Sequence, residues 1–264
     1  MKLFIFILLV SSSLFSDSFS TRYDVNVGMF GKVGYADVTL KEHSGKYEMK
    51  LVATLTGTAA NLTGNRIDTY VSKGEILDGK YIPDTFIKIK KTNRKERVQT
   101  YSFDHINKTV ALIETNSKWV SETKFDTKKF KLVKHDVQEN SSSNTNLDNY
   151  HNQDILSAYL NTRDSCNAQN TEFDLLAVGA HNDDKDITLS FLEGIHKQEG
   201  AQHFSSKEGH IYNLSVIPID KDEKRVDVLI ALDNDGLIKE AVLGDIFWIG
   251  EVNAKRVYHQ VSSN

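Results

Sequence analysis

The chain has 264 residues, of which 39% are hydrophobic and 26% are charged. This composition is typical of a globular protein with one large domain or two small ones. The formal net charge is −4, made of +7 in residues 1–137 (22 Lys/Arg, 15 Asp/Glu) and −11 in residues 138–264 (10 Lys/Arg, 21 Asp/Glu). Neither half is basic enough to indicate a nucleic-acid-binding protein.

Residues 1–20 have the features of a cleavable signal peptide. Lys2 precedes an apolar run, Leu3–Val10, that is too short to span a bilayer, and several serine residues follow it. We expect cleavage between Ser16 and Thr21, export to the periplasm, and a soluble mature chain. A short N-terminal membrane anchor is the alternative interpretation.

Residues 21–137 predict an N-terminal half of successive antiparallel strands. The segment "KYEMKLVATL" (residues 46–55) alternates apolar and polar residues, which is typical of a strand with one face in water. Short separators that contain Gly, Asn and Asp provide turns between such segments. The segment "TGTAANLTGN" (residues 56–65) breaks the alternation, and we expect a helical turn there.

Residues 138–151 are polar, rich in Ser and Asn, and predict an exposed linker. Residues 152–260 then predict one helix followed by a C-terminal antiparallel half, which forms one structural unit with the N-terminal half. The helix, at about residues 152–162, contains "DILSAYLNTR", with Asn152 as the expected N-cap and Asp154 in the first turn. Its apolar residues recur at helical spacing: Ile155, Leu156, Tyr159 and Leu160.

One predicted hairpin is strongly basic. The segment "KIKKTNRKER" places six cations around its tip: Lys88, Lys90, Lys91, Arg94, Lys95 and Arg97. They could meet an anionic membrane surface or an acidic partner. The interpretation that we favour is a solvated hairpin whose lysines prevent pairing between sheet edges.

Two segments could suggest metal ions. "NDDKDITLSFLE" (residues 182–193) has acidic residues at EF-hand spacing, but Ile187 stands where that loop requires glycine. His196, His203 and His210 lie seven residues apart in a segment with an irregular backbone, and scattered surface histidines explain them better than zinc. We therefore predict no metal ion and no cofactor.

No catalytic motif stands out, so we predict no catalytic residues. Cys166 is the only cysteine, and an exported chain with one cysteine cannot form an internal disulfide. It could be a nucleophile or an intermolecular link, but a tolerated small residue is the better interpretation. Trp119 and Trp248 fall within or beside predicted strands, where aromatic side chains either fill a core or line an apolar cavity.

The order of several motifs resembles an exported bacterial family known as domain of unknown function 3108. The helix matches its Asp-x-Leu-Ser-x-x-Tyr signature at Asp154, Leu156, Ser157 and Tyr159. The other matching segments are "YDVNVGMFGKVGYADVTL", "YIPDTFIKIKK", "YSFD" and "DVLIALDNDGLIKEAV". The resemblance implies a periplasmic, β-rich protein without an established activity.

More distantly, the chain is similar to the half-barrel of the outer-membrane lipoprotein carrier proteins. This implies a mainly β fold, with a curved antiparallel sheet or open half-barrel whose concave apolar face is covered by the predicted helix. The expected ligand-binding residues are Ile155, Leu156, Tyr159, Leu160, Trp119 and Trp248. The alternative is a plain core helix with no cavity behind it.

These observations predict a non-enzymatic periplasmic protein that binds an apolar or lipid-like ligand, or an envelope partner. A structural or assembly protein of the cell envelope is the second interpretation, and a periplasmic hydrolase is the third. The expected partners are an apolar ligand, an envelope protein or an anionic membrane surface, and not nucleic acid. The sequence predicts no oligomeric state.

Overall fold

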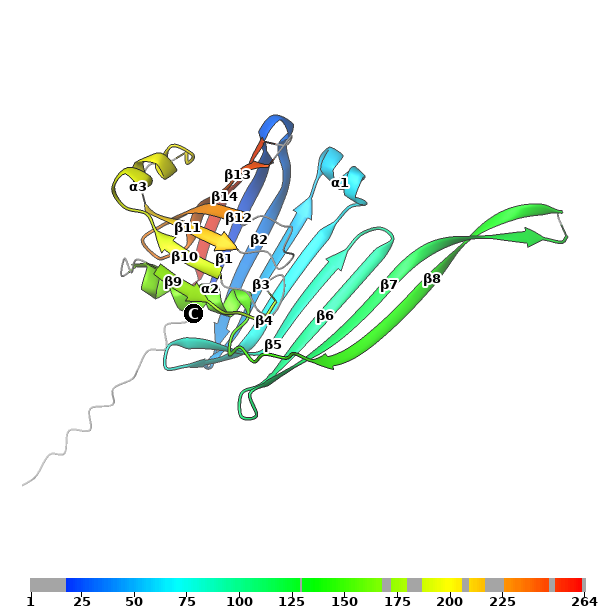
Figure 1. The fold of residues 1–264 in the computed structure, drawn as a ribbon, viewed down its shortest axis with the longest axis horizontal. Helices are drawn as coiled ribbons and strands as arrows, with labels where there is room; N and C mark the ends of the chain where they lie inside the picture. Colours follow the sequence, from blue (N-terminus) through cyan, green and yellow to red (C-terminus); the bar gives the residue numbers. More distant parts are fainter. Residues whose placement is uncertain are drawn as a thin grey trace, which may run out of the picture.

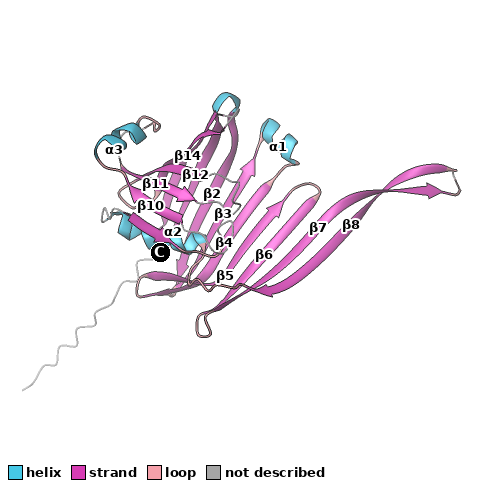
Figure 2. Ribbon diagram, viewed as in Figure 1, coloured by secondary structure: helices cyan, strands magenta, loops and turns pink. Residues whose placement is uncertain are grey.

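The computed structural model describes residues 18–128, 130–167, 172–179, 187–205, 209–216, 226–246 and 250–262. These residues form one antiparallel sheet of fourteen strands and three α-helices (Figures 1 and 2). The first eight strands are β1 (Ser18–Val27), β2 (Gly31–His43), β3 (Lys46–Leu55), β4 (Ile67–Leu77), β5 (Lys80–Lys91), β6 (Lys95–Asp104), β7 (Thr109–Asp126) and β8 (Lys131–Asn146).

The remaining strands follow the longest helix of the chain. They are β9 (Glu172–Leu175), β10 (Ile187–Phe191), β11 (His210–Val216), β12 (Val226–Leu232), β13 (Ile238–Ile246) and β14 (Gly250–Ser262). The helices are α1 (Gly57–Thr63), α2 (Ile155–Asn167) and α3 (Gly194–Ala201), with a short 3-10 turn, η1 (Gly28–Phe30). None of the helices in the described ranges is long and apolar enough to cross a membrane.

The sheet has two arms that meet at its first strand. Its order is β8-β7-β6-β5-β4-β3-β2-β1-β14-β13-β12-β11-β10-β9, so β1 pairs with β2 on one side and with β14 on the other. The chain runs outward along the first arm to β8 and returns from the opposite edge at β9. Helix α2 lies in the connection between the two edges.

The sheet curls around α2. This helix packs on β4 and β5 of the first arm, and it also borders a cavity lined by β10, β11, β12 and β13 of the second arm. Strands that are far apart in the sheet order can contact the same helix only if the sheet is strongly curved. The predicted curved antiparallel sheet with a covering helix is therefore confirmed.

Each arm buries apolar residues according to the two-residue period of a strand. In β3, Tyr47 and Met49 are buried and Leu51 packs beside them, as the alternation in residues 46–55 predicts. In β11, Tyr212 belongs to a cluster on the α2 side, whereas Ile211 belongs to a second cluster that includes Phe204, just after α3. The second arm therefore has a helix over each face.

The predicted linker is corrected by the structure. Residues 138–146 form the C-terminal half of β8, paired with Ala111–Trp119 of β7, and are not a linker. Their polar composition reflects exposure on both faces of an edge strand, which needs no apolar side chain to pair its backbone. Strand β1 begins at Ser18, within the range where we expect cleavage, and residues 1–17 lie outside the described residues. The signal peptide stays a prediction.

The helices were only partly predicted. The helical turn expected at residues 56–65 is α1, and the main helix is α2, which begins three residues later than expected and extends to Asn167. The sequence analysis did not predict helix α3. Its sequence, "GIHKQEGA", is mostly polar and contains two glycines, which are unfavourable in helices. Only Gly200 among its residues is buried, so the sequence has little of the apolar period that reveals a helix.

Candidate ligand-binding cavity beside helix α2

Asp154 caps the N-terminus of α2. Its Oδ1 accepts hydrogen bonds from the backbone N–H groups of Leu156 (2.8 Å) and Ser157 (3.1 Å), and the Ser157 hydroxyl lies 2.9 Å from the Asp154 nitrogen. This reciprocal pair satisfies donors that a helix start otherwise leaves unpaired. The N-cap is therefore Asp154, and the prediction of Asn152 is wrong.

The same carboxylate attaches the helix to the sheet. The Ser72 hydroxyl on β4 donates to Asp154 Oδ2 at 2.6 Å, and the Tyr47 hydroxyl on β3 lies 2.9 Å from Ser72 Oγ. All three side chains are buried. Burial raises the pKa of Asp154, and its hydrogen bonds to Ser72, Ser157 and Leu156 oppose this rise only in part.

One face of α2 packs against the first arm of the sheet. Leu156 and Leu160 are buried in the cluster that contains Tyr47, Tyr81 and Phe86. Asn161 binds the backbone of Tyr81 twice, accepting from its N–H at 2.8 Å and donating to its carbonyl at 3.0 Å. Ser157 is fully buried because it belongs to the cap.

The opposite face of α2 borders a cavity of about 300 Å³. Ile155, Ala158 and Tyr159 contribute one wall, and the second arm of the sheet contributes the other. The side chains of that second wall come from β10, β11, β12 and β13: Leu189, Leu214, Ile230, Leu232 and Ile238. This volume falls at the lower end of the range for small-molecule sites, which are mostly apolar with a few polar groups.

The polar groups around the cavity have partners in the protein. The Thr162 hydroxyl donates to the carbonyl oxygens of Ala158 and Tyr159, at 3.0 and 2.9 Å. The Tyr159 hydroxyl accepts from the Ile238 N–H at 3.3 Å. Burial raises the pKa of Tyr159, so its hydroxyl is neutral at physiological pH. Arg163 lies at the same border and adds the one positive charge among the lining residues.

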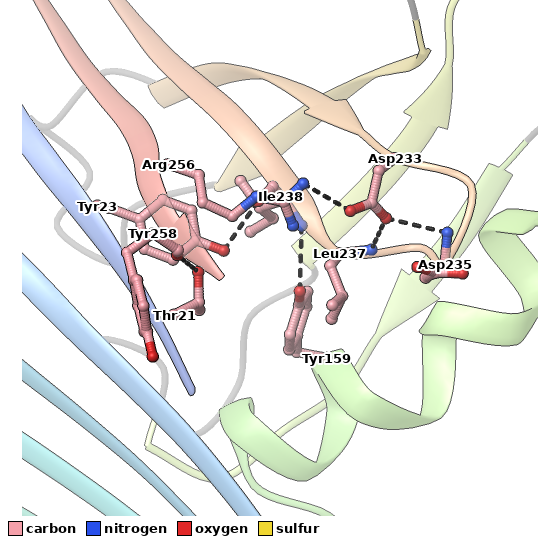
Figure 3. A network of polar contacts seen from close by, with 9 residues as sticks. All are labelled: Thr21, Tyr23, Tyr159, Asp233, Asp235, Leu237, Ile238, Arg256 and Tyr258. Atoms are coloured by element: carbon pink, nitrogen blue, oxygen red, sulfur yellow. Dashed lines mark hydrogen bonds and ion pairs between the residues drawn. The ribbon is translucent and has the colours of Figure 1, made fainter. Parts of the chain in front are cut away.

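The hairpin between β12 and β13 holds the far border of the cavity (Figure 3). Asp233 accepts from the Leu237 N–H at 2.9 Å and forms an ion pair with Arg256 of β14 at 2.7 Å. The Tyr23 hydroxyl of β1 donates to the Ile238 carbonyl at 2.8 Å. These contacts connect the wall of the cavity to the two strands where the arms of the sheet meet.

The turn of this hairpin packs tightly against α2. Gly236 has a φ of +70°, and a Cβ atom there would lie 2.6 Å from both Cγ and the carbonyl oxygen of Arg163. Only glycine accepts this backbone conformation without strain and leaves room for the helix. The "DNDG" segment is therefore a hairpin turn, as the sequence predicts, and also a contact surface for α2.

The predicted ligand-binding residues do not all lie at the cavity. Ile155 and Tyr159 line the cavity, whereas Leu156 and Leu160 pack on the other side of the helix. Trp119 lies on β7 and is 45% exposed, away from the cavity-lining residues, and Trp248 lies outside the described residues. Sequence reasoning missed Ala158 and the strand residues, although the alternation of "VDVLIAL" places Ile230 and Leu232 on one face.

The six cations of the predicted basic hairpin do not act as one free basic surface. Lys88 donates to the Gly179 carbonyl at 2.8 Å. Three of the others form ion pairs within the protein: Lys91 with Glu96, Arg94 with Asp136 and Arg97 with Glu114. Lys90 and Lys95 are exposed on β5 and β6. Binding of the six cations to an anionic surface stays a prediction.

The residues considered for metal binding lie on different elements. His196 is on α3 near Glu199, the His203 ring lies 3.1 Å from Glu251, and His210 begins β11. Within the described part of the chain, no group of three or more His, Cys, Asp or Glu side chains could hold a metal ion. Residues 180–186 of the EF-hand-like segment and the Cys166 side chain lie outside the description.

Comparisons with known proteins identify no family for this chain. No family model matches it, and no curated protein matches it. Among solved structures, it is similar to a β-barrel-like protein of the domain of unknown function DUF1849 from Brucella abortus. The TM-score is 0.45 and the identity 11%, over 94% of this chain and 99% of that chain. Membership of the family known as domain of unknown function 3108 stays a prediction.

Proposed function

We propose that the chain is a non-enzymatic, exported protein of the cell envelope that binds an apolar or lipid-like ligand beside α2. The cavity of about 300 Å³ carries this proposal, because apolar side chains from α2 and from the second arm of the sheet converge on it. The hydrogen bonds of Thr162 and Tyr159 go to the backbone, which leaves a surface suited to hydrocarbon. Arg163 at the border would suit an anionic end of such a ligand.

The first test is native mass spectrometry of protein purified from the periplasm. A co-purified lipid or other apolar small molecule is the expected result. Protein that carries no bound molecule, and that also fails to take up an apolar probe, would contradict the proposal.

The second test uses the fluorescent apolar probe Nile red and a pair of compensating substitutions. Ala158→Phe fills the cavity from the helix side and should weaken probe binding about tenfold or more, since it removes most of the apolar contact area. Leu214→Ala enlarges the cavity from β11, so the double variant should regain binding. Unchanged probe binding by a folded Ala158→Phe variant would exclude this cavity.

Leu156→Ala distinguishes the two faces of the helix. Because Leu156 packs in the main core, this change should lower the free energy of unfolding by about 2–5 kcal/mol. Probe affinity of the folded variant should stay near that of the wild type. Circular dichroism and chemical denaturation report the fold and stability of each variant.

A structural or assembly role in the envelope is the second candidate function. The observation that favours it is the pair of sheet edges, at β8 and β9, which offer backbone groups to an added strand. Concentration-dependent oligomers that disappear when proline replaces Ser141 or Ser143 of β8 would support it. Hydrolytic activity stays an untested prediction.

A further inference from the structure

Strands β7 and β8 extend well beyond the rest of the sheet. Strand β6 pairs with β7 only along Thr109–Lys118. The next eight residues, Trp119–Asp126, pair with Lys131–Gln138 of β8 and with no other described strand. Arg94, in the turn between β5 and β6, contacts the base of this two-stranded segment at Trp119, Ser121 and Asp136. At about 3.3 Å per residue, this two-stranded ribbon places its tip roughly 26 Å beyond the last strand that supports it. Figure 1 shows the ribbon leaving the body of the molecule.

The tip of this ribbon exposes three large apolar side chains. Phe125, Phe130 and Leu132 are 54%, 84% and 69% exposed. Phe125 and Leu132 are directly opposite in the strand register, and the Phe125 and Phe130 rings meet edge to face with centroids 6.1 Å apart. The three residues therefore form one cluster, named here the apolar tip. An exposed apolar cluster that does not contribute to the packing of the core is typical of an interaction surface.

Lysine residues surround the apolar tip. Lys124, Lys128, Lys131 and Lys134 lie within six residues of Phe130 in the sequence. Residues 122–134 carry five Lys and two acidic residues, a formal charge of +3. Lys134 is opposite Thr123 in the register, on the same strand face as Leu132. Lys124 is paired with Glu122, at 2.9 Å, on the other face.

We propose that the apolar tip docks on a membrane surface that contains anionic lipids. Phe125, Phe130 and Leu132 enter the boundary between headgroups and acyl chains, where aromatic rings are favoured. The lysines contact lipid phosphates, and their long apolar stems let the charged ends reach the headgroups. The rest of the ribbon contains Trp119 and three valines among polar residues, and it acts as a spacer between the bilayer and the body. This docking is independent of the cavity beside α2.

Charge complementarity favours a lipid surface over an acidic protein. The apolar tip offers three side chains on a narrow end instead of a broad complementary face. A stable protein–protein interface buries far more surface than such an end provides. A bilayer needs no shape complementarity, so a few apolar side chains with surrounding cations are enough for reversible binding.

The test measures sedimentation of the full chain with two kinds of vesicle. One contains phosphatidylcholine alone, and the other contains equal parts of phosphatidylcholine and phosphatidylglycerol. We expect clear binding to the anionic vesicles, weak binding to the neutral ones, and loss of binding as salt is added. Absence of binding to anionic vesicles at low salt would overturn the proposal.

Variants separate the apolar and the charged contributions. Phe130→Ser should weaken binding to anionic vesicles about tenfold or more. The double charge reversal Lys131→Glu/Lys134→Glu should do the same and remove the salt dependence. Ile106→Ser is the matched apolar control, since Ile106 is 93% exposed in the turn between β6 and β7, and it should change nothing. Lys90→Glu/Lys95→Glu is the matched charge control, on the hairpin between β5 and β6.

Fluorescence tests insertion directly. Phe130→Trp should shift tryptophan emission to the blue on anionic vesicles, relative to the wild type with only Trp119 and Trp248. Equal binding by wild type and Phe130→Ser, or binding without a blue shift, would overturn insertion of the tip. Loss of binding in both control variants would overturn the assignment to this ribbon. Nile red uptake should be the same in all these variants. The experiment therefore distinguishes an error in the proposed ligand-binding cavity from an error in the proposed membrane docking of the apolar tip.

Discussion

The residues of "DILSAYLN" show how one short segment can attach a helix to a sheet. Asp154 and Ser157 form the cap, Leu156 and Leu160 enter the core, and Asn161 binds the backbone of a neighbouring strand. The polar residues of this segment are therefore structural. The same signature identifies the helix in the sequence, but its polar members could be given roles only once β3, β4 and β5 were placed beside it.

Asp154 should make the stability of the protein depend on pH, because its carboxyl group binds a proton more tightly in the folded protein than in the unfolded chain. Burial raises its pKa above the value in an unfolded chain, about 3.9. Its stabilising contribution is therefore complete below that value and is lost as pH rises through the higher folded pKa. The free energy of unfolding of the wild type should fall relative to Asp154→Asn as pH is raised from about 4.

Asp154→Asn is the appropriate reference, because asparagine keeps an oxygen for the two helix N–H groups and cannot ionise. Asp154→Ala should lose about 1–3 kcal/mol throughout the range, because Ser72 and the helix start lose their acceptor. Urea denaturation at a series of pH values measures all three proteins. A free energy of unfolding of the wild type that rises relative to that of Asp154→Asn as pH increases would contradict the raised pKa.

Gly236 should tolerate substitution less well than an ordinary turn glycine. Gly236→Ala combines a left-handed backbone with a clash against Arg163. Gly45→Ala, at a φ of +72° with nothing within 4 Å, involves only the backbone strain, about 1–2 kcal/mol. Thermal unfolding should place Gly236→Ala clearly below Gly45→Ala in stability. Equal losses would mean that α2 moves away from the turn without cost.

At the scale of elements, the ribbon of β7 and β8 should be the least protected part of the sheet. Two strands without a third are marginally stable in water. Amide hydrogens in residues 119–126 should therefore exchange faster than those in residues 109–118 of the same strand, which also pair with β6. Hydrogen exchange with mass spectrometry compares the two parts within one strand. Equal protection along β7 would show that the ribbon is supported by another contact.

The elements that the sequence predicts well are those with an apolar period. The alternation in β3 and the helical spacing in α2 depend on residues that face a core, and both elements are confirmed. Strand β8 faces water on both sides and α3 buries one glycine, so neither needs apolar residues. Their sequences do not differ from those of loops, because backbone pairing with a neighbour leaves no mark on side-chain composition.

The candidate cavity could be predicted only on its helix side. Ile155 and Tyr159 follow from the helical period, whereas the opposite wall comes from β10 to β13, which are separate in sequence. Only the curl of the sheet brings the two walls together. Leu156 and Leu160, also expected to bind a ligand, pack in the main core on the other side of the helix. The helical period shows that a side chain is buried, but it does not show which of two apolar surfaces that side chain contacts.

At the scale of the whole molecule, the start of the sheet limits where a leader could be removed. Ser18 pairs with Ser262, and Phe19 is buried between Leu40 and Val261. If residues before the sheet are cleaved during export, the cut should fall before Ser18, because loss of a buried Phe costs about 3–5 kcal/mol. N-terminal sequencing of the exported protein measures this. A stable mature chain that begins at Ser20 or Thr21 would contradict it.

The pairing of β1 with β14 has a consequence for how the protein is made. The Thr21 hydroxyl donates to the Tyr258 carbonyl, 237 residues away, so the first strand of the sheet depends on a strand that is made much later. Neighbouring hairpins within each arm can form early and locally, but joining the arms carries the entropy of closing a very long loop. A chain that stops before β14 leaves the inner edge of β1 open, and an open edge recruits other strands. Strand β14 must therefore be made before the sheet can close.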